Sequence, residues 1–350
     1  MNPTKVEQFV GQVLADLAAA YSGMLVNLGH KLGYYRALSG AGPLTAEELA
    51  ERTGTLPRYA LEWLNNQYAG GYMTYDPTTK RYELPAEHAF ILGNPESPFF
   101  ISPAFDGASS LWLDEHKILE AYQRRTGLAW GEHDHRLFHA TEAFFKNGYR
   151  ENLTSRWIPS LEGVERKLLE GGKVADIGCG HGASTLLMAL RYPRSQVTGF
   201  DYHRPSIEMA RQRARETGIE GRVHFQEASA ADFPGSGYDL ICFMDAFHDL
   251  GDPLSAAQHC LAALAPGGCL MLVEPFANDQ VELNVGPVAR LFYAASAAVC
   301  TPNAVSQGGR YTLGAQAGQA RLEAILHEAG FTQVRRATET PFNLVIEARA

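Results

Sequence analysis

The stretch that decides the fold is KVADIGCGHGAST, residues 173–185, where a short apolar run leads into three closely spaced glycines. The apolar run predicts a buried strand, and the segment after the glycines predicts a helix. Glycine lets the connecting loop turn tightly and approach a ligand, while the helix N-terminus adds the positive end of a dipole. The stretch therefore predicts a ligand-binding loop at the carboxyl end of a strand.

Six further apolar runs extend this pattern to residue 350. Helical segments separate the first six runs of the whole set, which predicts a parallel sheet with helices on both faces. Only a few residues join the last two runs, so the last strand is expected to run antiparallel. The predicted fold class is α/β, a Rossmann-like seven-stranded sheet with one antiparallel strand. Its runs are KVADIG, QVTGFD, RVHFQEA, YDLICFMD, CLMLVEP, TQVRRAT and PFNLVIEAR.

The first ninety residues have the pattern of a winged helix. Apolar side chains three and four apart predict an amphipathic helix in the first twenty residues, and a second helix is expected over about 24–38. Thr45 and Glu48 form a capping box for a third helix, and Pro57 opens a fourth. Two short strands around an Asp-Pro-Thr-Thr turn complete the α-helical winged-helix domain that precedes the α/β sheet.

These patterns divide the chain into three parts. We expect a winged-helix domain over 1–92, a helical linker and lid over 93–172, and the α/β domain over 173–350. Within the middle part, helices are expected over 111–122 and 136–169.

Composition excludes several classes of protein. The 350 residues are 45% hydrophobic and 20% charged, which is ordinary for a globular chain, and the net charge of −9 argues against nucleic acid as the main partner. No uninterrupted apolar run approaches the ~20 residues of a membrane span, and the N-terminus lacks a secretory pattern. For lack of such a run, no membrane partner is expected. The five cysteines include no C-x-x-C, which favours reduced thiols in the cytoplasm.

Taken alone, the glycine loop fits a dinucleotide cofactor, another cofactor bound by a G-x-G-x-G loop, or a plain tight turn. Residues 178–183 also fit G-x-G-x-x-A, the pattern of loops that bind NAD or FAD. Asp176 precedes the first glycine by two residues, where a carboxylate repels a pyrophosphate but attracts an ammonium group. Asp201, at the end of the second strand, is placed to accept both ribose hydroxyls of either cofactor.

With these acids and the final hairpin, residues 173–350 resemble class I S-adenosylmethionine-dependent methyltransferases. The resemblance implies that the loop containing Gly178, Gly180 and Gly182 passes under the methionine part of the cofactor, with Asp176 near its amino group. It also implies ribose binding by Asp201 and a contact between Tyr202 and the adenine.

After the third strand, many relatives have an aspartate that reaches the exocyclic amine of the adenine. This chain has Ser229 there, so the contact is expected to fall to the backbone at Ala230 or to Asp232. Asp245, at the end of the fourth strand, is also expected beside the cofactor.

The catalytic candidates follow the fourth and fifth strands. His248 lies three residues after the fourth strand, and the fifth ends in Glu274-Pro275. Neighbouring strand ends can pair such side chains. His248, Asp249, Asp252 and Glu274 resemble the H-D-x-x-D pattern and strand-end glutamate of caffeic-acid-type O-methyltransferases. The resemblance implies that His248 removes the proton of the acceptor hydroxyl. The alternative is that His248 caps a helix or packs under the cofactor.

Several other residues have open roles. Tyr149, Trp157 and Asp249 are expected to line the substrate pocket, although both aromatics could equally be core residues. His133, His135 and His139 suggest a metal, but lid-lining or solvated histidines are favoured and no metal is predicted. Cys300 is expected to be a packed thiol.

The winged helix permits two functions. The fourth helix carries one cation, Arg58, balanced by Glu62, which is a poor footprint for DNA. The pattern resembles the winged-helix dimerisation domain of a bacterial group of regulator-like methyltransferases, and this resemblance extends over almost the whole chain. It implies a homodimer that methylates a small-molecule acceptor. The alternatives are a ligand-sensing DNA-binding regulator and a nicotinamide oxidoreductase.

Overall fold

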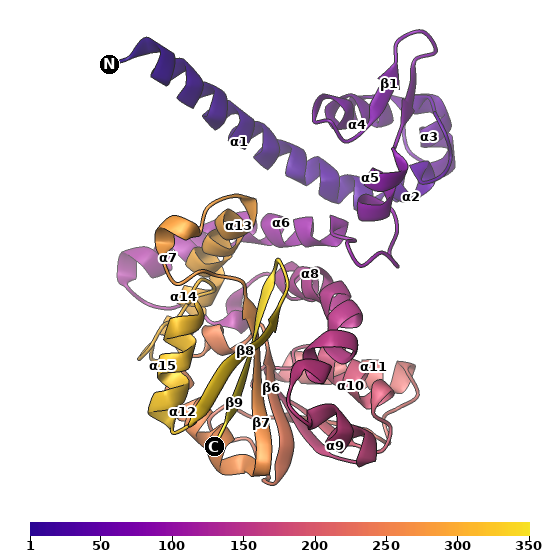
Figure 1. Cartoon of the computed structure of the whole chain (residues 1–350). Coiled ribbons are helices and arrows are strands. Elements are labelled where there is room, and N and C mark those ends of the chain that lie inside the picture. The colour runs from indigo at the N-terminus through magenta and orange to yellow at the C-terminus, as the bar shows by residue number, and fades with distance from the viewer. The chain divides into compact units, whose positions relative to one another are not determined.

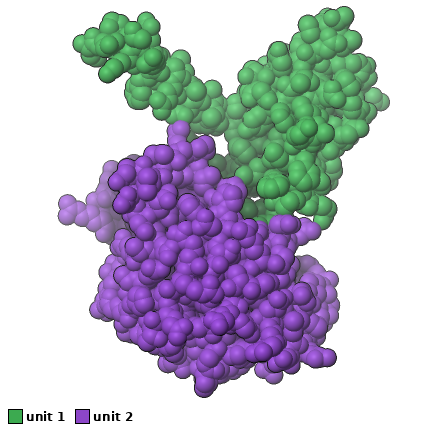
Figure 2. Space-filling model, viewed as in Figure 1, with its two compact units in different colours: residues 1–113, 134–148 green, residues 114–133, 149–350 purple.

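The computed structural model describes all 350 residues, which form two compact units. Unit 1 comprises residues 1–113 and 134–148, and unit 2 comprises residues 114–133 and 149–350 (Figure 2). The segment expected as linker and lid is thus divided between the two units.

Unit 1 contains the expected winged helix. The capping box is present, because the Thr45 hydroxyl accepts a hydrogen bond from the Glu48 amide at 3.3 Å and Glu48 Oε2 accepts one from the Thr45 amide at 2.8 Å. The core of the unit packs the rings of Tyr34 and Tyr35 edgewise against Trp63. Its elements are α1 (Pro3–Lys31), α2 (Tyr34–Leu38), α3 (Ala46–Thr53), α4 (Pro57–Ala69), β1 (Thr74–Asp76), β2 (Arg81–Glu83), α5 (Ala86–Leu92), η1 (Ser102–Ala104), α6 (Phe105–Leu113) and most of α8 (Arg136–Asn152).

The first helix is longer than the sequence pattern predicts. The expectation of separate helices over the first twenty residues and over 24–38 is wrong, since α1 continues unbroken to Lys31. Proline occurs only at its first position, and no residue within it has a positive φ. The break comes at Gly33, whose φ of 73° is left-handed, and α2 begins after it.

Helix α1 is also long and apolar enough to cross a membrane, judged by length and composition alone. An 18-residue window has a mean hydropathy of 1.4, and 6% of that window is buried within the chain. Scattered polar residues interrupt its apolar sequence, so the helix contains no long uninterrupted apolar run.

The helices of the middle segment are shorter than expected. The helix predicted over 111–122 is two helices, α6 and α7 (Glu115–Arg124), with Asp114 between them. The helix predicted over 136–169 ends at Asn152, followed by a π-helical turn η3 (Leu153–Trp157) and a turn η4 (Ile158–Ser160) that contains Pro159. Helix α9 (Val164–Glu170) then leads into the sheet.

Unit 2 is built on the predicted seven-stranded sheet, whose strand order is β5-β4-β3-β6-β7-β9-β8. The last strand, β9, is antiparallel to both of its neighbours, as expected. In Figure 1, α9, α10 and α11 cover one face of the sheet and α12 and α15 the other. The strands are β3 (Lys173–Ile177), β4 (Gln196–Asp201), β5 (Val223–Glu227), β6 (Tyr238–Met244), β7 (Leu264–Pro275), β8 (Gln333–Glu339) and β9 (Asn343–Arg349).

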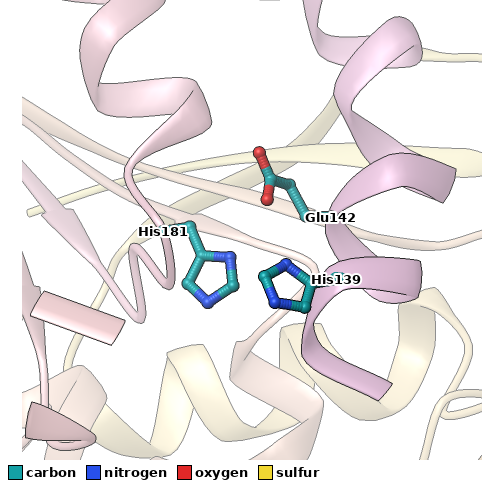
Figure 3. Close-up of side chains that lie close together, drawn as sticks. All are labelled: His139, Glu142 and His181. Atoms are coloured by element: carbon teal, nitrogen blue, oxygen red, sulfur yellow. The ribbon is translucent and has the colours of Figure 1, made fainter. Parts of the chain in front are cut away.

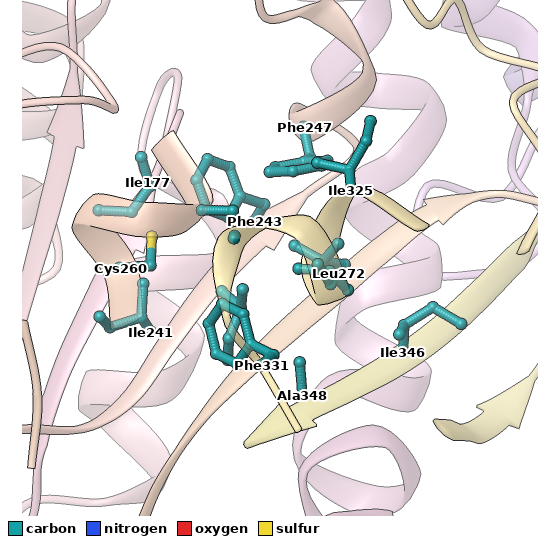
Figure 4. Close-up of a cluster of buried hydrophobic side chains, with 14 of the residues drawn as sticks. Ile177, Ile241, Phe243, Phe247, Cys260, Leu272, Ile325, Phe331, Ile346 and Ala348 are labelled. Carbon is teal, nitrogen blue, oxygen red and sulfur yellow. The ribbon is translucent and has the colours of Figure 1, made fainter. Parts of the chain in front are cut away.

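Burial explains why the apolar strands lie at the centre of the sheet and the most polar one at its edge. The central strands β3, β6 and β7 are nearly continuous apolar runs because both faces are covered, whereas the edge strand β8 is largely polar. The buried cluster in Figure 4 joins strand side chains such as Phe243 and Leu272 to Ile325 of α15. The other elements of the unit are η2 (Trp130–Glu132), α10 (Ala183–Arg191), α11 (Arg204–Glu216), η5 (Phe247–Asp249), α12 (Pro253–Ala263), η6 (Val281–Leu283), α13 (Pro287–Ala295), η7 (Ser296–Cys300), α14 (Thr301–Ser306) and α15 (Gln319–Ala329).

Candidate active site

The sheet brings the predicted site residues to one edge. Strands β4, β3, β6 and β7 are consecutive neighbours and parallel, so the loops that follow them meet at their carboxyl ends. The glycine loop follows β3, Asp201 ends β4, Asp245 follows β6, and Glu274 lies near the end of β7.

The glycine loop requires glycine at each of its three positions. Gly178, Gly180 and Gly182 have φ values of 70°, 53° and 81°, a region that other residues rarely adopt. A Cβ at Gly178 would lie 2.7 Å from the Ala246 side chain, and one at Gly182 would lie 2.7 Å from the Phe225 ring. A Cβ at Gly180 would meet nothing within 4 Å, so this part of the loop faces open space.

Asp176 is completely buried at the base of the loop. Its Oδ2 accepts hydrogen bonds of 2.6 Å from both Ser184 and Thr185 at the start of α10, and Cys242 Sγ lies 3.6 Å from Oδ1. Burial raises the pKa of this carboxyl to about 6, against the effect of these hydrogen bonds. The carboxylate thus ties the strand to the helix, and its contact with a ligand amino group stays a prediction.

Asp201 connects the glycine loop after β3 with the turn after β4. Its Oδ2 accepts a hydrogen bond from the Gly180 amide and its Oδ1 accepts one from the His203 amide, each at 2.8 Å. Burial raises the pKa of Asp201, while these two amides lower it. The side chain therefore fixes the glycine loop as well as standing where a ribose contact is predicted.

An open depression of about 440 Å³ lies at the carboxyl ends of β4 and β5, between Tyr202 and the segment that follows β5. Tyr202, which is 45% exposed, forms part of its wall, and its hydroxyl donates a hydrogen bond to Asn303 Oδ1 at 3.2 Å. Ser229 also lines the depression, and its Oγ accepts from the Ala231 amide. Asp232 lines it too and accepts from the Ser229 amide, whereas Ala230 packs against the apolar core.

Asp245 has a strained backbone and two side-chain donors. Its φ is 52°, which is uncommon for a non-glycine residue and places it at the turn that leaves β6. Tyr149 donates to its Oδ2 and Asn343 of β9 donates to its Oδ1, both at 2.8 Å. Burial and the nearby Glu274 hold the pKa of Asp245 well above its usual value.

Tyr149 and Trp157 stack edgewise with ring centroids 6.0 Å apart. Trp157 is 1% exposed, which is the burial of a core residue, and its Nε1 has no hydrogen-bond partner in the chain. Tyr149 contributes its hydroxyl to the site through Asp245. The lining of a substrate pocket by either aromatic stays a prediction.

The expected contact between His248 and Glu274 is present. His248 Nδ1 lies 2.6 Å from Glu274 Oε2, and both side chains are buried. The backbone amides of Phe247 and His248 also donate to the Glu274 carboxylate, which locks its orientation. A carboxylate at Nδ1 fixes the imidazole tautomer and the orientation of the ring.

A second carboxylate faces the other side of this imidazole. Asp249 Oδ1 lies 3.2 Å from His248 Nε2. Burial alone would lower the pKa of His248, but Asp249 and Glu274 outweigh it and hold the pKa well above its usual value. Their negative charge therefore stabilises the imidazolium form.

The sequence did not indicate that Cys300 and Asn303 belong to this cluster. Cys300 of η7 lies within 4.8 Å of the ligand atoms of His248 and Asp249, and burial raises its pKa to about 12, as expected for a packed thiol. Asn303 of α14 receives hydrogen bonds from the Trp130 amide and the Tyr202 hydroxyl, and it donates to the Asp249 carbonyl. No local pattern reveals these contacts, because their partners are distant in the chain.

Two other sets of candidates from the sequence remain: Asp252, and the histidines considered as metal ligands. Asp252 caps α12, since it accepts hydrogen bonds from both the amide and the hydroxyl of Ser255. Figure 3 draws His139 and Glu142 of α8 together with His181 of the glycine loop. The first two belong to unit 1 and the third to unit 2, so we assign them no common metal site.

The fold and the loops define a Rossmann-like domain of the methyltransferase type that follows a winged helix. Comparison with known families agrees: residues 168–330 match the model of a methyltransferase domain, and residues 20–94 match that of the Rv2258c-like winged HTH domain. The chain is therefore similar to a winged helix-turn-helix domain in its first part and to a methyltransferase domain in its second.

Individual relatives support the same fold. The 27-O-demethylrifamycin SV methyltransferase of Amycolatopsis mediterranei is 29% identical over 145 residues, which are 41% of this chain and 51% of the relative. The chain spans about half or less of the length of the curated relatives it matches.

Two solved structures match along nearly the whole chain. PigF with S-adenosylhomocysteine has a TM-score of 0.71 at 19% identity and covers 100% of this chain and 99% of its own. The O-methyltransferase NcsB1 from neocarzinostatin biosynthesis, in complex with S-adenosylmethionine and 2-hydroxy-5-methyl naphthoic acid, has a TM-score of 0.65 at 17% identity and covers 97% and 98%. At these identities the likeness establishes the fold.

Proposed function

We propose that the chain is an S-adenosylmethionine-dependent methyltransferase that acts on a hydroxyl group of a small-molecule acceptor, with His248 as the general base. The observation that carries this proposal is the buried pair of His248 and Glu274 at neighbouring strand ends, one strand away from the glycine loop. A base oriented by a carboxylate beside a cofactor loop is the arrangement that proton removal during methyl transfer needs.

The surroundings of the loop fit the proposed cofactor. The open space at Gly180 and the depression lined by Tyr202 and Ser229 leave room for a ligand beside Asp201. When bound, S-adenosylmethionine supplies a methyl group on a sulfonium. The residues proposed to hold it are Asp176, Gly178, Gly180, Gly182, Asp201, Tyr202, Ser229, Ala230 and Asp245.

The remaining chemistry belongs to the chain. His248 Nε2 takes the proton of the acceptor hydroxyl, and the imidazolium that forms is stabilised by Glu274 and Asp249. Tyr149, Trp157 and Asp249 are proposed to shape the acceptor site. Most of the acceleration is expected from positioning the acceptor oxygen in line with the methyl group.

The test is direct. Calorimetry of the full chain with S-adenosylhomocysteine and with NAD should give binding of the first and none of the second. Incubation with S-adenosylmethionine and a panel of phenols should add 14 Da to a phenol, detected by mass spectrometry, because one CH₂ is gained on methylation. Binding of NAD without binding of S-adenosylhomocysteine would refute the proposal.

We also propose that residues 1–92 dimerise the chain, that 93–172 link and cover the site, and that 173–350 perform the chemistry. The exposed apolar side chains of α1, among them Phe9, Val13 and Leu17, support a homodimer. Within α4, Trp63 and Leu64 are buried and Arg58 is paired with Glu62, which disfavours DNA as a partner. Five free and buried cysteines fit a cytoplasmic protein.

A further inference from the structure

A second histidine in unit 2 is held by a carboxylate in the same manner as His248. His133, just after η2, has a fully buried side chain whose Nδ1 lies 3.2 Å from Asp114 Oδ2. Asp114 is buried as well, and its Oδ1 pairs with Lys117 Nζ at 2.8 Å. Paired with the Lys117 ammonium, the Asp114 side chain accepts a hydrogen bond from His133 and so places the proton of that ring on Nδ1.

This arrangement leaves the other ring nitrogen unsatisfied. His133 Nε2 is buried and has no hydrogen-bond partner in the chain. Burial lowers the pKa of His133 more than Asp114 raises it, so the ring is neutral at neutral pH and Nε2 presents a bare lone pair. An unpaired buried acceptor destabilises the folded chain, and a ligand that donates a hydrogen bond would remove this cost.

The turn that carries His133 is tied to the proposed catalytic loop. The His133 amide donates to the Trp130 carbonyl at 3.2 Å, and the Trp130 amide donates to Asn303 Oδ1 at 3.0 Å. Asn303 in turn donates to the carbonyl of Asp249, the residue after His248.

The two histidines, His248 and His133, also differ in the protonation state that their surroundings favour. Two carboxylates stabilise the protonated form of His248, whereas burial keeps His133 neutral. Titratable groups whose pKa values are pushed apart in one site commonly have separate roles.

We propose that His133 is a substrate-contacting residue whose Nε2 accepts a hydrogen bond from a second hydroxyl group of the acceptor. This proposal rests on the proposed methyltransferase function and narrows its substrate class to small molecules with at least two hydroxyls. One hydroxyl meets His248 and is methylated, and the other meets His133 and fixes the orientation of the molecule.

The experiment compares catechol and resorcinol, which have two hydroxyls, with phenol, which has one. Dissociation constants are measured by calorimetry on the full chain saturated with S-adenosylhomocysteine. We expect the better dihydroxy probe to bind about three- to tenfold more tightly than phenol, the worth of one hydrogen bond. The variant His133→Phe should remove this preference, and His135→Phe, a change at an exposed neighbouring histidine, should keep it.

A second measurement needs no variant. In the wild-type chain, NMR of labelled histidine should report His133 as the neutral tautomer with its proton on Nδ1, and the dihydroxy probe should move its Nε2 signal. A proton on Nε2, an unmoved signal, or equal affinities for all three probes would overturn the role of His133. Failure of S-adenosylhomocysteine to bind would instead count against the proposed function itself.

Discussion

His248 Nδ1 lies 2.6 Å from Glu274 Oε2, although the two residues are 26 positions apart and belong to different strand ends. The contact exists because β6 and β7 are parallel neighbours, so the residues at and just beyond their carboxyl ends are brought together. The carboxylate is held in turn by two backbone amides of the His248 turn. The pair is therefore rigid, and its proposed chemistry can be tested one residue at a time.

The first prediction concerns the imidazole. His248→Ala should reduce turnover about 10²–10⁴-fold, because proton removal from the acceptor is lost. Affinity for S-adenosylmethionine should stay nearly unchanged, as measured by calorimetry. His224→Ala, at an exposed position on β5, is the matched control. Near-full turnover by His248→Ala would mean that positioning alone drives transfer.

The second prediction concerns pH. The carboxylates around His248 raise its pKa, so the free base grows as the pH rises and the wild-type rate should rise through a midpoint above 6.5. Glu274→Gln removes one negative charge, lowers the pKa of His248 and should move this midpoint to lower pH. The amide still accepts a hydrogen bond, so the loss of turnover should be smaller than for His248→Ala. A midpoint that does not move would show that Glu274 is not coupled to the base.

The sequence predicted those parts of the fold whose signal is local. Continuous apolar runs located the buried strands, and the Thr45–Glu48 box located the start of α3. The end of α1 was missed because only Gly33 marks it, and a single glycine is a weak stop signal.

The site could be predicted only as far as parallel strand ends must meet. That rule placed His248 beside Glu274. The side chains of Cys300, Asn303 and Asn343 come from elements further along the chain, and only the packing of those elements brings them to the site. The contact of His133 with Asp114 depends on a turn after α7, which no periodicity describes. Such contacts are consequences of tertiary packing.

The third prediction separates two glycines of one loop. Both Gly178→Ala and Gly180→Ala place alanine at a positive φ, which costs about 1–2 kcal/mol. Gly178→Ala also drives a Cβ to 2.7 Å from Ala246, so its melting temperature should fall further. Gly180→Ala meets open space and should mainly weaken binding of S-adenosylhomocysteine. Equal melting temperatures would contradict the packing at Gly178.

The fourth prediction concerns Asp201. Asp201→Ala should weaken binding of S-adenosylmethionine by about 1–3 kcal/mol, because a carboxylate that receives ribose hydroxyls is lost and the Gly180 amide loses its acceptor. Glu216→Ala, at an exposed position on α11, serves as the control in the same calorimetric titration. Unchanged affinity in Asp201→Ala would remove this residue from the cofactor site.

The last prediction concerns the exposed surface of α1. Phe9 is 64% exposed and Val13 is 48% exposed, and Val6, Val10, Leu14 and Leu17 of the same helix are exposed too. A chain in water is stabilised when such an apolar surface is covered. Sedimentation equilibrium should give about twice the chain mass of 38.3 kDa. The double variant Phe9→Glu with Val13→Glu should shift the protein towards the monomer, since charges would have to be buried in the interface.

Tyr59→Glu, which changes an exposed aromatic on α4, tests whether any new surface charge has the same effect. If dimerisation is through α1, this control should stay a dimer. A wild-type monomer that binds duplex DNA with a steep salt dependence would favour a DNA-binding regulator over a dimeric methyltransferase. In that case α4 would be a recognition helix and the methyltransferase domain a ligand sensor.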